Sequence, residues 1–192
     1  VKRIFDVVVS SIMLILLSPV ILVISIAIKL DTPGNVIFKQ ERVTRYNRMF
    51  YIYKFRTMVS NAENLGTQVT VDNDVRITRV GGFLRKYRLD ELPQLLNILK
   101  GDMSFVGPRP EVRKFVNEYT PEMYAALLLP AGVTSLASIY FKDEDKLLSQ
   151  ATNAEETYLT EILPVKMKYN LEYIKCFNFW YDIKLMFLTV FA

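Results

Sequence analysis

The sequence predicts a predominantly helical α+β fold, built as a monotopic membrane protein that enters and leaves the bilayer by one face. Three observations predict it: an uncharged run from Val7 to Ile28 with Ser18-Pro19 at its middle, two neighbouring segments of β type at 36–42 and 49–56, and apolar residues at helical spacing through much of the remainder. We therefore expect a re-entrant helix-break-helix, a small β-hairpin and amphipathic interfacial helices.

The composition limits the chemistry that the chain can perform. Its 192 residues suit one domain with a modest core, and a hydrophobic content of 51% is at the upper end for a soluble protein. The sequence has no histidine and one cysteine, Cys176, which excludes His-based triads, His or Cys clusters around a metal, and an internal disulfide. Catalysis would therefore have to use carboxylates, lysine, arginine or hydroxyl groups.

The run from Val7 to Ile28 is long enough to cross a bilayer, which takes about 20 apolar residues, so a single transmembrane helix is one interpretation. We expect no cleaved signal peptide, because the run is too long and no small-residue cleavage site follows it. Proline inside a helix removes a backbone hydrogen bond and kinks the helix, so Ser18-Pro19 should break the run.

The charges around this run favour a hairpin over a span. Basic residues flank both of its ends: Lys2, Arg3, Lys29, Lys39, Arg42, Arg45 and Arg48. Positive charge favours the cytoplasmic side of a membrane, so both flanks should lie on that side. We expect a re-entrant anchor over residues 1–30, followed by one further unit over residues 31–192.

Two segments after the turn at 31–34 have the composition of strands. Residues 36–42 and 49–56 are rich in β-branched and aromatic side chains and are joined by a polar turn, which predicts a hairpin. Alternate residues of a strand share a face, so Lys54 and Arg56 should project together as two charges for a pair of phosphates. The alternative is a solvated edge strand that lysine protects from aggregation.

The remaining segments are mostly helical in pattern. The stretch at 61–74 is polar, and we expect a mobile loop there, with no function assigned. Helices are predicted at three places: 111–119, from Pro121 onward, and 157–173 with an interruption near Pro164. Residues 171–192 combine many aromatic side chains with charges, which suits a helix in the lipid headgroup layer. A packed C-terminal core helix is the alternative.

Two adjacent acids, Asp90 and Glu91, lie between a basic run and a short amphipathic helix. Leucines at helical spacing from 92 to 99 predict that helix, and Lys100-Gly101 ends it. Proline is favoured at the first helical position, so Pro93 places both acids at or just outside the N-cap. The helix N-terminus and nearby arginines favour ionised carboxylates at neutral pH. The alternative is an ordinary helix cap with solvated arginine partners.

A second candidate feature follows that helix. Pro108 and Pro110 bracket Arg109 directly after Gly107, which fixes an extended turn. Such a turn offers a guanidinium and free backbone N–H groups, which are the donors that phosphate needs. Arg85, in the basic run before the acids, adds a further cation.

These features belong to an ordered set of motifs that covers nearly the whole chain. The set is Lys2-Arg3-x-Phe5-Asp6, Ser18-Pro19, Lys54-Phe55-Arg56-Thr57-Met58, Asp74-x-Arg76-Ile77-Thr78, Leu84-Arg85, Leu89-Asp90-Glu91-Leu92-Pro93-Gln94, Gly101-Asp102-Met103-Ser104, Gly107-Pro108-Arg109-Pro110 and Asp182-Ile183-Lys184. It resembles the bacterial sugar transferases, the monotopic phosphoglycosyl transferases that begin the assembly of lipid-linked glycans.

The resemblance implies transfer of a sugar 1-phosphate from a UDP-sugar to polyprenyl (undecaprenyl) phosphate, with release of UMP. Asp90 would attack the phosphorus and form a covalent aspartyl phospho-sugar intermediate, and Glu91 would position the metal or the second nucleophile. Both acids would hold Mg2+, which hard carboxylate and phosphate oxygens favour. The residues implied in phosphate binding are Lys54, Arg56, Arg85, Pro108, Arg109 and Pro110.

The resemblance also places the protein at the cytoplasmic face of the bacterial inner membrane, with residues 31–192 as the catalytic unit. Its partners would be the UDP-sugar, polyprenyl phosphate and membrane lipid, and no nucleic acid. Its role would be in glycoconjugate or exopolysaccharide biosynthesis. A homo-oligomer is compatible with the sequence.

The chain departs from the family's pattern at two places. Ala131, Ser135 and Ser138 replace residues of the family's Pro-Gly-Ile-Thr-Gly-Leu-Ala-Gln, so the resemblance does not fix the nucleotide selectivity that it would assign partly to this loop. The basic residue expected shortly afterwards is at best Lys142. Arg88 stands where the family more often has a serine and adds charge beside the nucleophile.

The alternative function is a non-catalytic, membrane-anchored module that binds anionic lipid or nucleic acid. A sequence pI near 9.1 and the spacing of Arg42, Arg45 and Arg48 support it. Against it, acids inside a basic cluster weaken the binding of anions. A metal-dependent nuclease would share the carboxylates but would give the lipid anchor no role.

Overall fold

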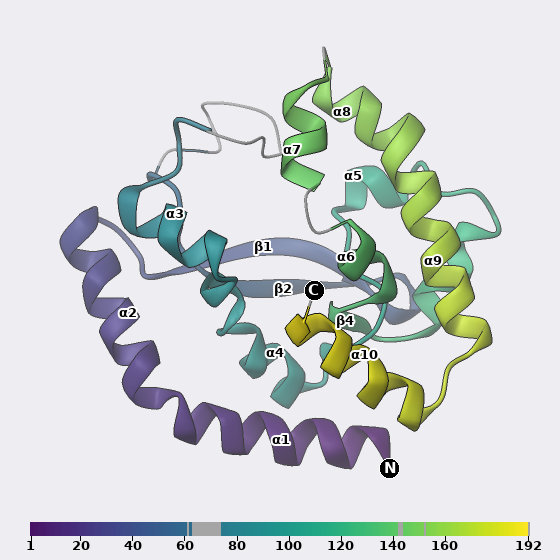
Figure 1. Ribbon diagram of the computed structural model, residues 1–192, viewed down its shortest axis with the longest axis horizontal. Helices are drawn as coiled ribbons and strands as arrows, with labels where there is room; N and C mark the ends of the chain where they lie inside the picture. Colours follow the sequence, from purple (N-terminus) through teal and green to yellow (C-terminus); the bar gives the residue numbers. More distant parts are fainter. Residues whose placement is uncertain (61, 63–73, 142–143, 152, 192) are drawn as a thin grey trace.

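The computed structural model describes residues 1–60, 62, 74–141, 144–151 and 153–191. Most of these residues are helical, and two small two-stranded sheets lie among the helices (Figure 1). The predicted α+β class, with its helical majority and its hairpin, is therefore confirmed. Most of the loop expected at 61–74, and Lys142, lie outside the described residues.

The N-terminal run forms two helices, α1 (Lys2–Leu16) and α2 (Ser18–Asp31), and the pair bends by 61°. Pro19 lies in the first turn of α2, where its missing N–H removes no helical hydrogen bond. Ser18 Oγ donates to the carbonyl of Ile15 at 2.8 Å across the bend. The break therefore lies where the sequence predicts it. Among the described residues no single helix is both long and apolar enough to span a bilayer, whereas the bent pair meets that test by length and composition.

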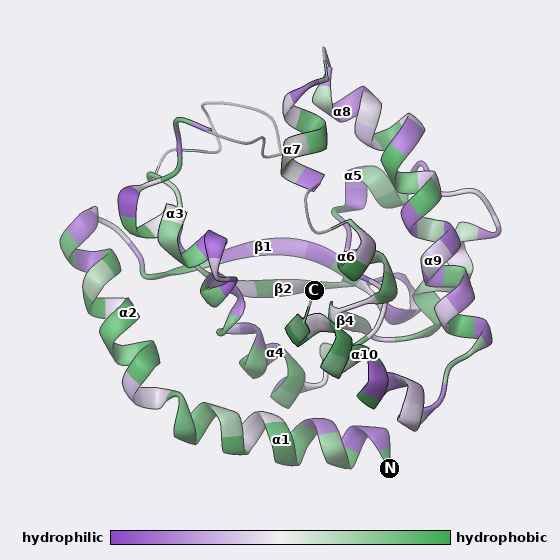
Figure 2. Cartoon of the chain, in the orientation of Figure 1, coloured by the Kyte–Doolittle hydropathy of each residue, from purple (hydrophilic) through white to green (hydrophobic). Residues whose placement is uncertain are grey.

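The buried face of α1 carries polar side chains, although the helix is apolar overall. Asp6 and Ser10 are buried on this face. Lys2, in the first turn, forms an ion pair with Asp182 of α10 (Phe179–Phe191). The opposite face of α1 exposes large apolar side chains: Ile4, Val8, Ile12 and Ile15. The helix therefore packs on the protein by a face that combines these polar residues with apolar ones such as Phe5 and Val9, and it turns other apolar residues outward. Figure 2 shows green, the colour of hydrophobic residues, along much of α1.

The predicted hairpin is formed by β1 (Ile37–Thr44) and β2 (Arg48–Phe55), which pair antiparallel. Its turn has two residues in the left-handed region, Tyr46 with φ 56° and Asn47 with φ 60°. Two consecutive residues of positive φ match the right-handed twist of the flanking strands. The turn therefore brings β1 and β2 back against each other over their full length.

Asn97 attaches the hairpin to α4 (Gln94–Lys100), the short helix that follows the acids. Its side-chain oxygen accepts from the backbone N–H of Tyr53 at 2.9 Å, and its amide donates to the carbonyl of Tyr51 at 2.7 Å. Asn97 is fully buried, so its amide group is closed off from water and depends on these two bonds. They fix the helix against the free edge of β2.

The second sheet is a parallel pair that the sequence did not predict, β3 (Met103–Val106) and β4 (Ala131–Thr134). Two glycines allow the backbones to approach closely at its end. A Cβ on Gly107 would lie 2.2 Å from the carbonyl oxygen of Pro130, and one on Gly132 would lie 2.1 Å from the nitrogen of Gly107. Neither position has room for a side chain, and this close approach fixes the start of the proline-bracketed turn.

Two helix predictions were wrong in extent. The helix predicted over 111–119 is a single turn, α5 (Arg113–Val116), because the carbonyl of Glu111 accepts a 2.9 Å hydrogen bond from a backbone N–H of β1 and holds the chain extended beside it. The segment after Pro121 forms a 3₁₀ helix, η4 (Met123–Leu128), instead of an α-helix.

The helix predicted over 157–173 is not broken at Pro164. It begins as α8 (Ala154–Thr157), passes through a π-helical turn (Tyr158–Ile162) and continues as α9 (Leu163–Lys175). A π turn is wider than an α turn, so it accommodates the proline ring and its missing N–H without ending the helix. The interruption predicted near Pro164 is therefore a π-helical turn and not a break in the helix.

The remaining helical elements are α3 (Arg79–Lys86), the 3₁₀ turn η3 (Leu89–Glu91), α6 (Leu136–Tyr140) and α7 (Glu144–Ser149). The last helix, α10, buries Asp182 and Leu185 and exposes Trp180, Phe187 and Phe191. It is thus a packed helix on one side, as one alternative predicted, and it exposes aromatic side chains on the other.

Candidate active site

Asp90 and Glu91 occupy a 3₁₀ turn of their own, η3, between α3 and α4. Arg88, just before the turn, has φ 56°, a left-handed conformation that redirects the chain after α3. Pro93 is the N-cap residue of α4, so the acids precede that helix as predicted, but in a separate turn. Asp90 is only 9% exposed.

Glu91 is held by two cations from different parts of the fold. Its Oε1 accepts from Lys54 Nζ of β2 at 3.0 Å and from Arg109 Nη2 at 2.9 Å. Burial opposes the ionisation of Glu91, but the charges and hydrogen bonds of Arg109 and Lys54 outweigh it and hold the pKa of Glu91 well below its ordinary value. The ionised Glu91 that the sequence predicts is therefore favoured here.

Asp90 has the opposite environment, although the sequence suggested that the two acids are alike. Burial raises the pKa of Asp90 above its ordinary value, and the negative charge of Glu91 adds to the effect. Lys54, Arg85 and Arg109 oppose it by attracting the carboxylate. A carboxylate that is desolvated in this way is more basic and more nucleophilic than one in water.

The prolines around Arg109 position it through their backbone. The carbonyl of Pro108 accepts from the N–H of Gly132 at 2.9 Å, and the carbonyl of Pro110 accepts from Arg42 Nη1 at 3.2 Å. With both flanking carbonyls fixed, the side chain of Arg109 is aimed at the acids. Pro108 and Pro110, predicted as phosphate-binding residues, thus position the guanidinium of Arg109.

Lys54 and Arg56, which the strand pattern places on one face, line the same hollow, but the guanidinium of Arg56 is bound to backbone carbonyls. Its Nη2 donates to the carbonyl of Thr32 at 2.6 Å, and its Nη1 donates to that of Pro33 at 2.9 Å. The reason is that β2 ends at Phe55 and the turn after α2 closes over its end, so these carbonyls lie within reach of the guanidinium; the carbonyl of Pro33 also accepts from Ser60 Oγ at 2.7 Å. Arg56 is therefore used to hold this turn.

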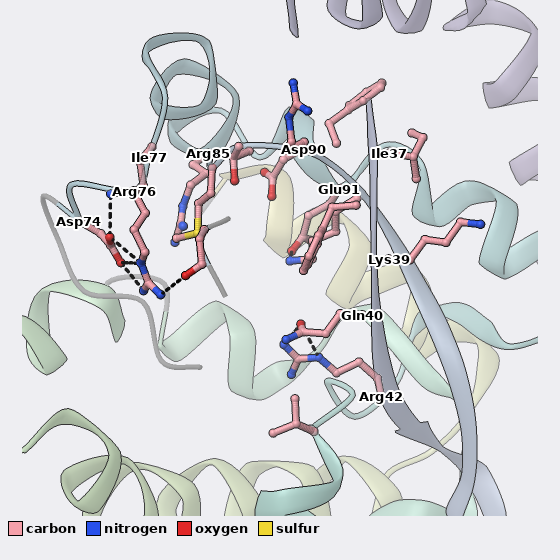
Figure 3. Close-up of a pocket in the computed structure, with 18 of the residues that line it drawn as sticks. Ile37, Lys39, Gln40, Arg42, Asp74, Arg76, Ile77, Arg85, Asp90 and Glu91 are labelled. Carbon is pink, nitrogen blue, oxygen red and sulfur yellow. Dashed lines mark hydrogen bonds and ion pairs between the residues drawn. The ribbon is translucent and has the colours of Figure 1, made fainter. Parts of the chain in front are cut away.

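The acids lie in a hollow that we call the basic hollow. Among the described residues, 13 basic and five acidic side chains line it, including Lys39, Arg42, Lys54, Arg79, Arg85 and Arg109. Figure 3 shows Arg85, Asp90 and Glu91 grouped on one side of it, with Gln40 and Arg42 further along β1. The structure therefore brings together the predicted Lys54, Arg85, Asp90, Glu91 and Arg109. This excess of positive charge suits a substrate that carries several phosphate charges.

The whole chain matches a known protein family. The family described as bacterial sugar transferase matches residues 1–192. The chain belongs to the bacterial sugar transferase family. The resemblance drawn from the motifs is thereby confirmed.

Curated relatives of this bacterial sugar transferase have related names. The UDP-N-acetylgalactosamine-undecaprenyl-phosphate N-acetylgalactosaminephosphotransferase of Aeromonas hydrophila is 41% identical, over 99% of this chain and 43% of the relative. The UDP-glucose:undecaprenyl-phosphate glucose-1-phosphate transferase of Escherichia coli is 39% identical, over 99% of this chain and 39% of the relative. A protein of the same name from Caulobacter vibrioides is 35% identical, over 98% of this chain and 68% of the relative. The chain thus spans about two fifths of the length of the first two relatives.

Asp90 and Glu91 are the side chains of this bacterial sugar transferase that would fit Mg2+ when a substrate supplies further ligands. Among the described residues there is no group of three or more His, Cys, Asp or Glu side chains placed to hold a metal. Magnesium usually takes one or two protein carboxylates and completes its shell with phosphate oxygens and water. The Asp90 carboxylate and the second oxygen of Glu91 fit that donor set.

The structure contains a polar network at the far end of the basic hollow that the sequence did not predict. The Tyr158 hydroxyl donates to Glu111 Oε1 at 2.6 Å, and the buried Lys166 donates to Glu144 Oε2 at 3.0 Å and to the Tyr158 hydroxyl at 3.0 Å. Arg42 belongs to the same end of the hollow. The only signal in the sequence was the position of Glu111 directly after the proline-bracketed turn, because the other members are distant in the chain.

Proposed function

We propose that the chain is a phosphoglycosyl transferase that moves a sugar 1-phosphate from a UDP-sugar to polyprenyl phosphate and releases UMP. The observation that carries the proposal is the buried Asp90 beside Glu91, whose carboxylate is bound by Lys54 and Arg109. A nucleophile with a raised pKa next to cations that can receive phosphate charge is what a displacement at phosphorus requires. The names of the relatives describe donors and acceptors of these classes.

The reaction takes two displacements. Asp90 attacks the phosphorus that carries the sugar, so that a bond from the carboxylate oxygen to phosphorus forms while the bond from phosphorus to the UMP oxygen breaks. UMP leaves with the electron pair. A phosphate oxygen of polyprenyl phosphate then attacks the phosphorus of the aspartyl phospho-sugar and releases the Asp90 carboxylate.

The cations around Asp90 stabilise the charge that moves during each step. Arg85 faces the Asp90 carboxylate, and Lys54 and Arg109 can shift from Glu91 to phosphate oxygens. Mg2+, held by Asp90 and Glu91 together with phosphate oxygens, would neutralise the diphosphate and improve the leaving group. Glu91 keeps the two cations in place between turnovers.

We place the site at the cytoplasmic face of a bacterial inner membrane, where a dissolved sugar nucleotide meets a lipid phosphate. Residues 1–30 would form the re-entrant anchor, supported by the bend at Ser18-Pro19 and by the outward apolar side chains of α1 and α2. The exposed Trp180 and Phe187 of α10 would lie in the headgroup layer. Residues 31–192 would then carry the chemistry at that plane.

The test measures UMP release from a panel of UDP-sugars by the purified protein with magnesium, with and without undecaprenyl phosphate. We expect about one UMP per active protein without the lipid, continued turnover with it, and a protein mass raised by one sugar phosphate in the first case. Asp90→Asn should abolish all three signals. Binding to anionic vesicles with no UMP from any UDP-sugar would support the non-catalytic alternative and refute the proposal.

A further inference from the structure

The surface of α3 divides into faces with different neighbours. Successive residues of an α-helix are about 100° apart around its axis, so residues three and four apart share a face. Arg79, Gly82 and Lys86 line the basic hollow. Val80 and Leu84 pack instead against α2, in a cluster with its buried isoleucines. The helix thus lies between the candidate active site and the second arm of the N-terminal hairpin, and Figure 1 shows α3 beside α2.

Two aromatic side chains occupy the arc of α3 between those faces. Phe83 is 58% exposed and Tyr87 is 55% exposed, and their ring centroids are 4.9 Å apart. Counted around the helix, Phe83 follows Arg79 by about 40° and Tyr87 precedes Val80 by about 20°, so the pair joins the hollow side to the α2 side. We call these two residues the aromatic ridge.

The aromatic ridge is apolar, and a positive charge lies beside it on the side of the basic hollow. Lys86 Nζ lies 5.5 Å from the centroid of the Tyr87 ring, and Lys86 also lines the hollow. Beyond its contact with α3, α2 exposes apolar residues on the arc away from its buried isoleucines: Leu22, Val23, Ile26 and Leu30. A ligand that fits this arrangement has a long apolar chain coming from α2 and an anionic head that ends in the hollow.

We propose that the aromatic ridge is the docking site for the isoprenoid chain of polyprenyl phosphate, with the phosphate directed toward Arg79 and Lys86. This inference rests on the proposed function for the identity of the lipid. The acceptor then approaches the aspartyl phospho-sugar from the α3 side, while the sugar nucleotide enters from the aqueous side of the hollow. The side chains of Phe83 and Tyr87 have no part in the first displacement.

The test compares the double variant Phe83→Ser, Tyr87→Ser with the unmodified protein in detergent. Native mass spectrometry measures binding of undecaprenyl phosphate and of undecaprenol, and a single-turnover assay measures UMP release without lipid. Losing the contact area of two rings should weaken undecaprenyl phosphate binding by about tenfold and leave the single-turnover release unchanged. Lys86→Gln should reduce the preference for undecaprenyl phosphate over undecaprenol.

Two variants control for damage to the fold. Phe83→Leu with Tyr87→Leu keeps the ridge apolar and should restore lipid binding to within about twofold. Tyr46→Asn removes an exposed tyrosine at the hairpin turn, 74% exposed and with φ 56°, and should change neither measurement.

The possible results distinguish failure of the docking proposal from failure of the proposed function. Unchanged lipid binding in the serine variant, no recovery in the leucine variant, or an equal loss of single-turnover UMP release would overturn the ridge. If the unmodified protein releases no UMP from any UDP-sugar, the proposed function fails, and the binding measurements still decide whether the ridge holds an isoprenoid phosphate.

Discussion

Glu91→Gln removes the charge that Lys54 and Arg109 share, and we expect it to destabilise the empty protein while strengthening its affinity for anions. The side chain of Glu91 is 10% exposed, and those of Lys54 and Arg109 are 22% and 30% exposed. Removing one partner of a buried pair costs about 3–5 kcal/mol, and the partial exposure of the cations puts our expectation at about 3 kcal/mol. In a chain of this size that corresponds to a fall in Tm of about 6–12 °C.

The assay is thermal unfolding in detergent with EDTA, with and without pyrophosphate. In the variant the two cations no longer have a carboxylate competing for them, so pyrophosphate should bind more tightly and raise Tm further than it does in the unmodified protein. A ligand at 100 times its Kd stabilises by about 2.7 kcal/mol, enough to recover most of the loss. Glu41→Gln, which removes an exposed acid from β1 in the same hollow, is the matched control and should leave Tm unchanged.

Two further effects, both on pH dependence, are expected for Glu91→Gln. The folded pKa of Glu91 lies below its ordinary value of 4.5, so its stabilisation is present above about pH 4.5 and is lost as the pH falls toward the folded pKa. The Tm difference between the two proteins should therefore shrink in acid. Because the charge of Glu91 raises the pKa of Asp90, the acid limb of single-turnover UMP release, if any release survives, should move to lower pH. Equal Tm values, or an equal response to pyrophosphate, would show that Glu91 does not occupy the anion site.

Three other predictions follow from the fold and the site. Asn97→Ala leaves two partly buried backbone groups of β2 unpaired and should lower stability by roughly 2–5 kcal/mol in thermal or denaturant unfolding; a loss below 1 kcal/mol would contradict the attachment of the hairpin to α4. EDTA should abolish UMP release and magnesium should restore it, and full activity in chelator would rule out the metal while leaving the transferase proposal in place. Ser18→Leu with Pro19→Leu should straighten α1 and α2 into a span, so that Val1→Cys, in a Cys176→Ser background, becomes labelled by an impermeant reagent in intact cells. Labelling before the straightening would disprove the re-entrant anchor.

The sequence predicted the parts of the fold that depend on local signals. The break at Ser18-Pro19 follows from the backbone chemistry of proline, and the hairpin follows from strand composition on either side of a polar turn. The position of Asp90 and Glu91 just before a helix followed from the helical spacing after Pro93, although the separate 3₁₀ turn that holds them did not. In each case the residues that decide the structure lie within a few positions of one another.

The sequence could not predict the features that depend on contacts between distant segments. The parallel pair of β3 and β4 consists of four-residue strands far apart in the chain, too short for an alternation pattern to be recognised. Strand alternation predicted the face of β2 from which Arg56 projects, but it could not predict the backbone carbonyls that the guanidinium binds. The difference between the pKa values of Asp90 and Glu91 depends on burial and on Arg109, which lies 18 positions from Glu91.

The ion pair between Lys2 and Asp182 joins residues 180 positions apart and therefore sets an order of assembly. A chain is synthesised from its N-terminus, so α1 is complete long before α10 exists. During that interval the face of α1 that carries Asp6 and Ser10 has no protein to cover it, and lipid cannot satisfy a carboxylate. On the proposed arrangement, the apolar side of the hairpin associates with the bilayer first, and the catalytic unit closes onto the polar side last. A ribosome-bound chain stopped before residue 182 should be membrane-attached while its N-terminal helix remains open to protease.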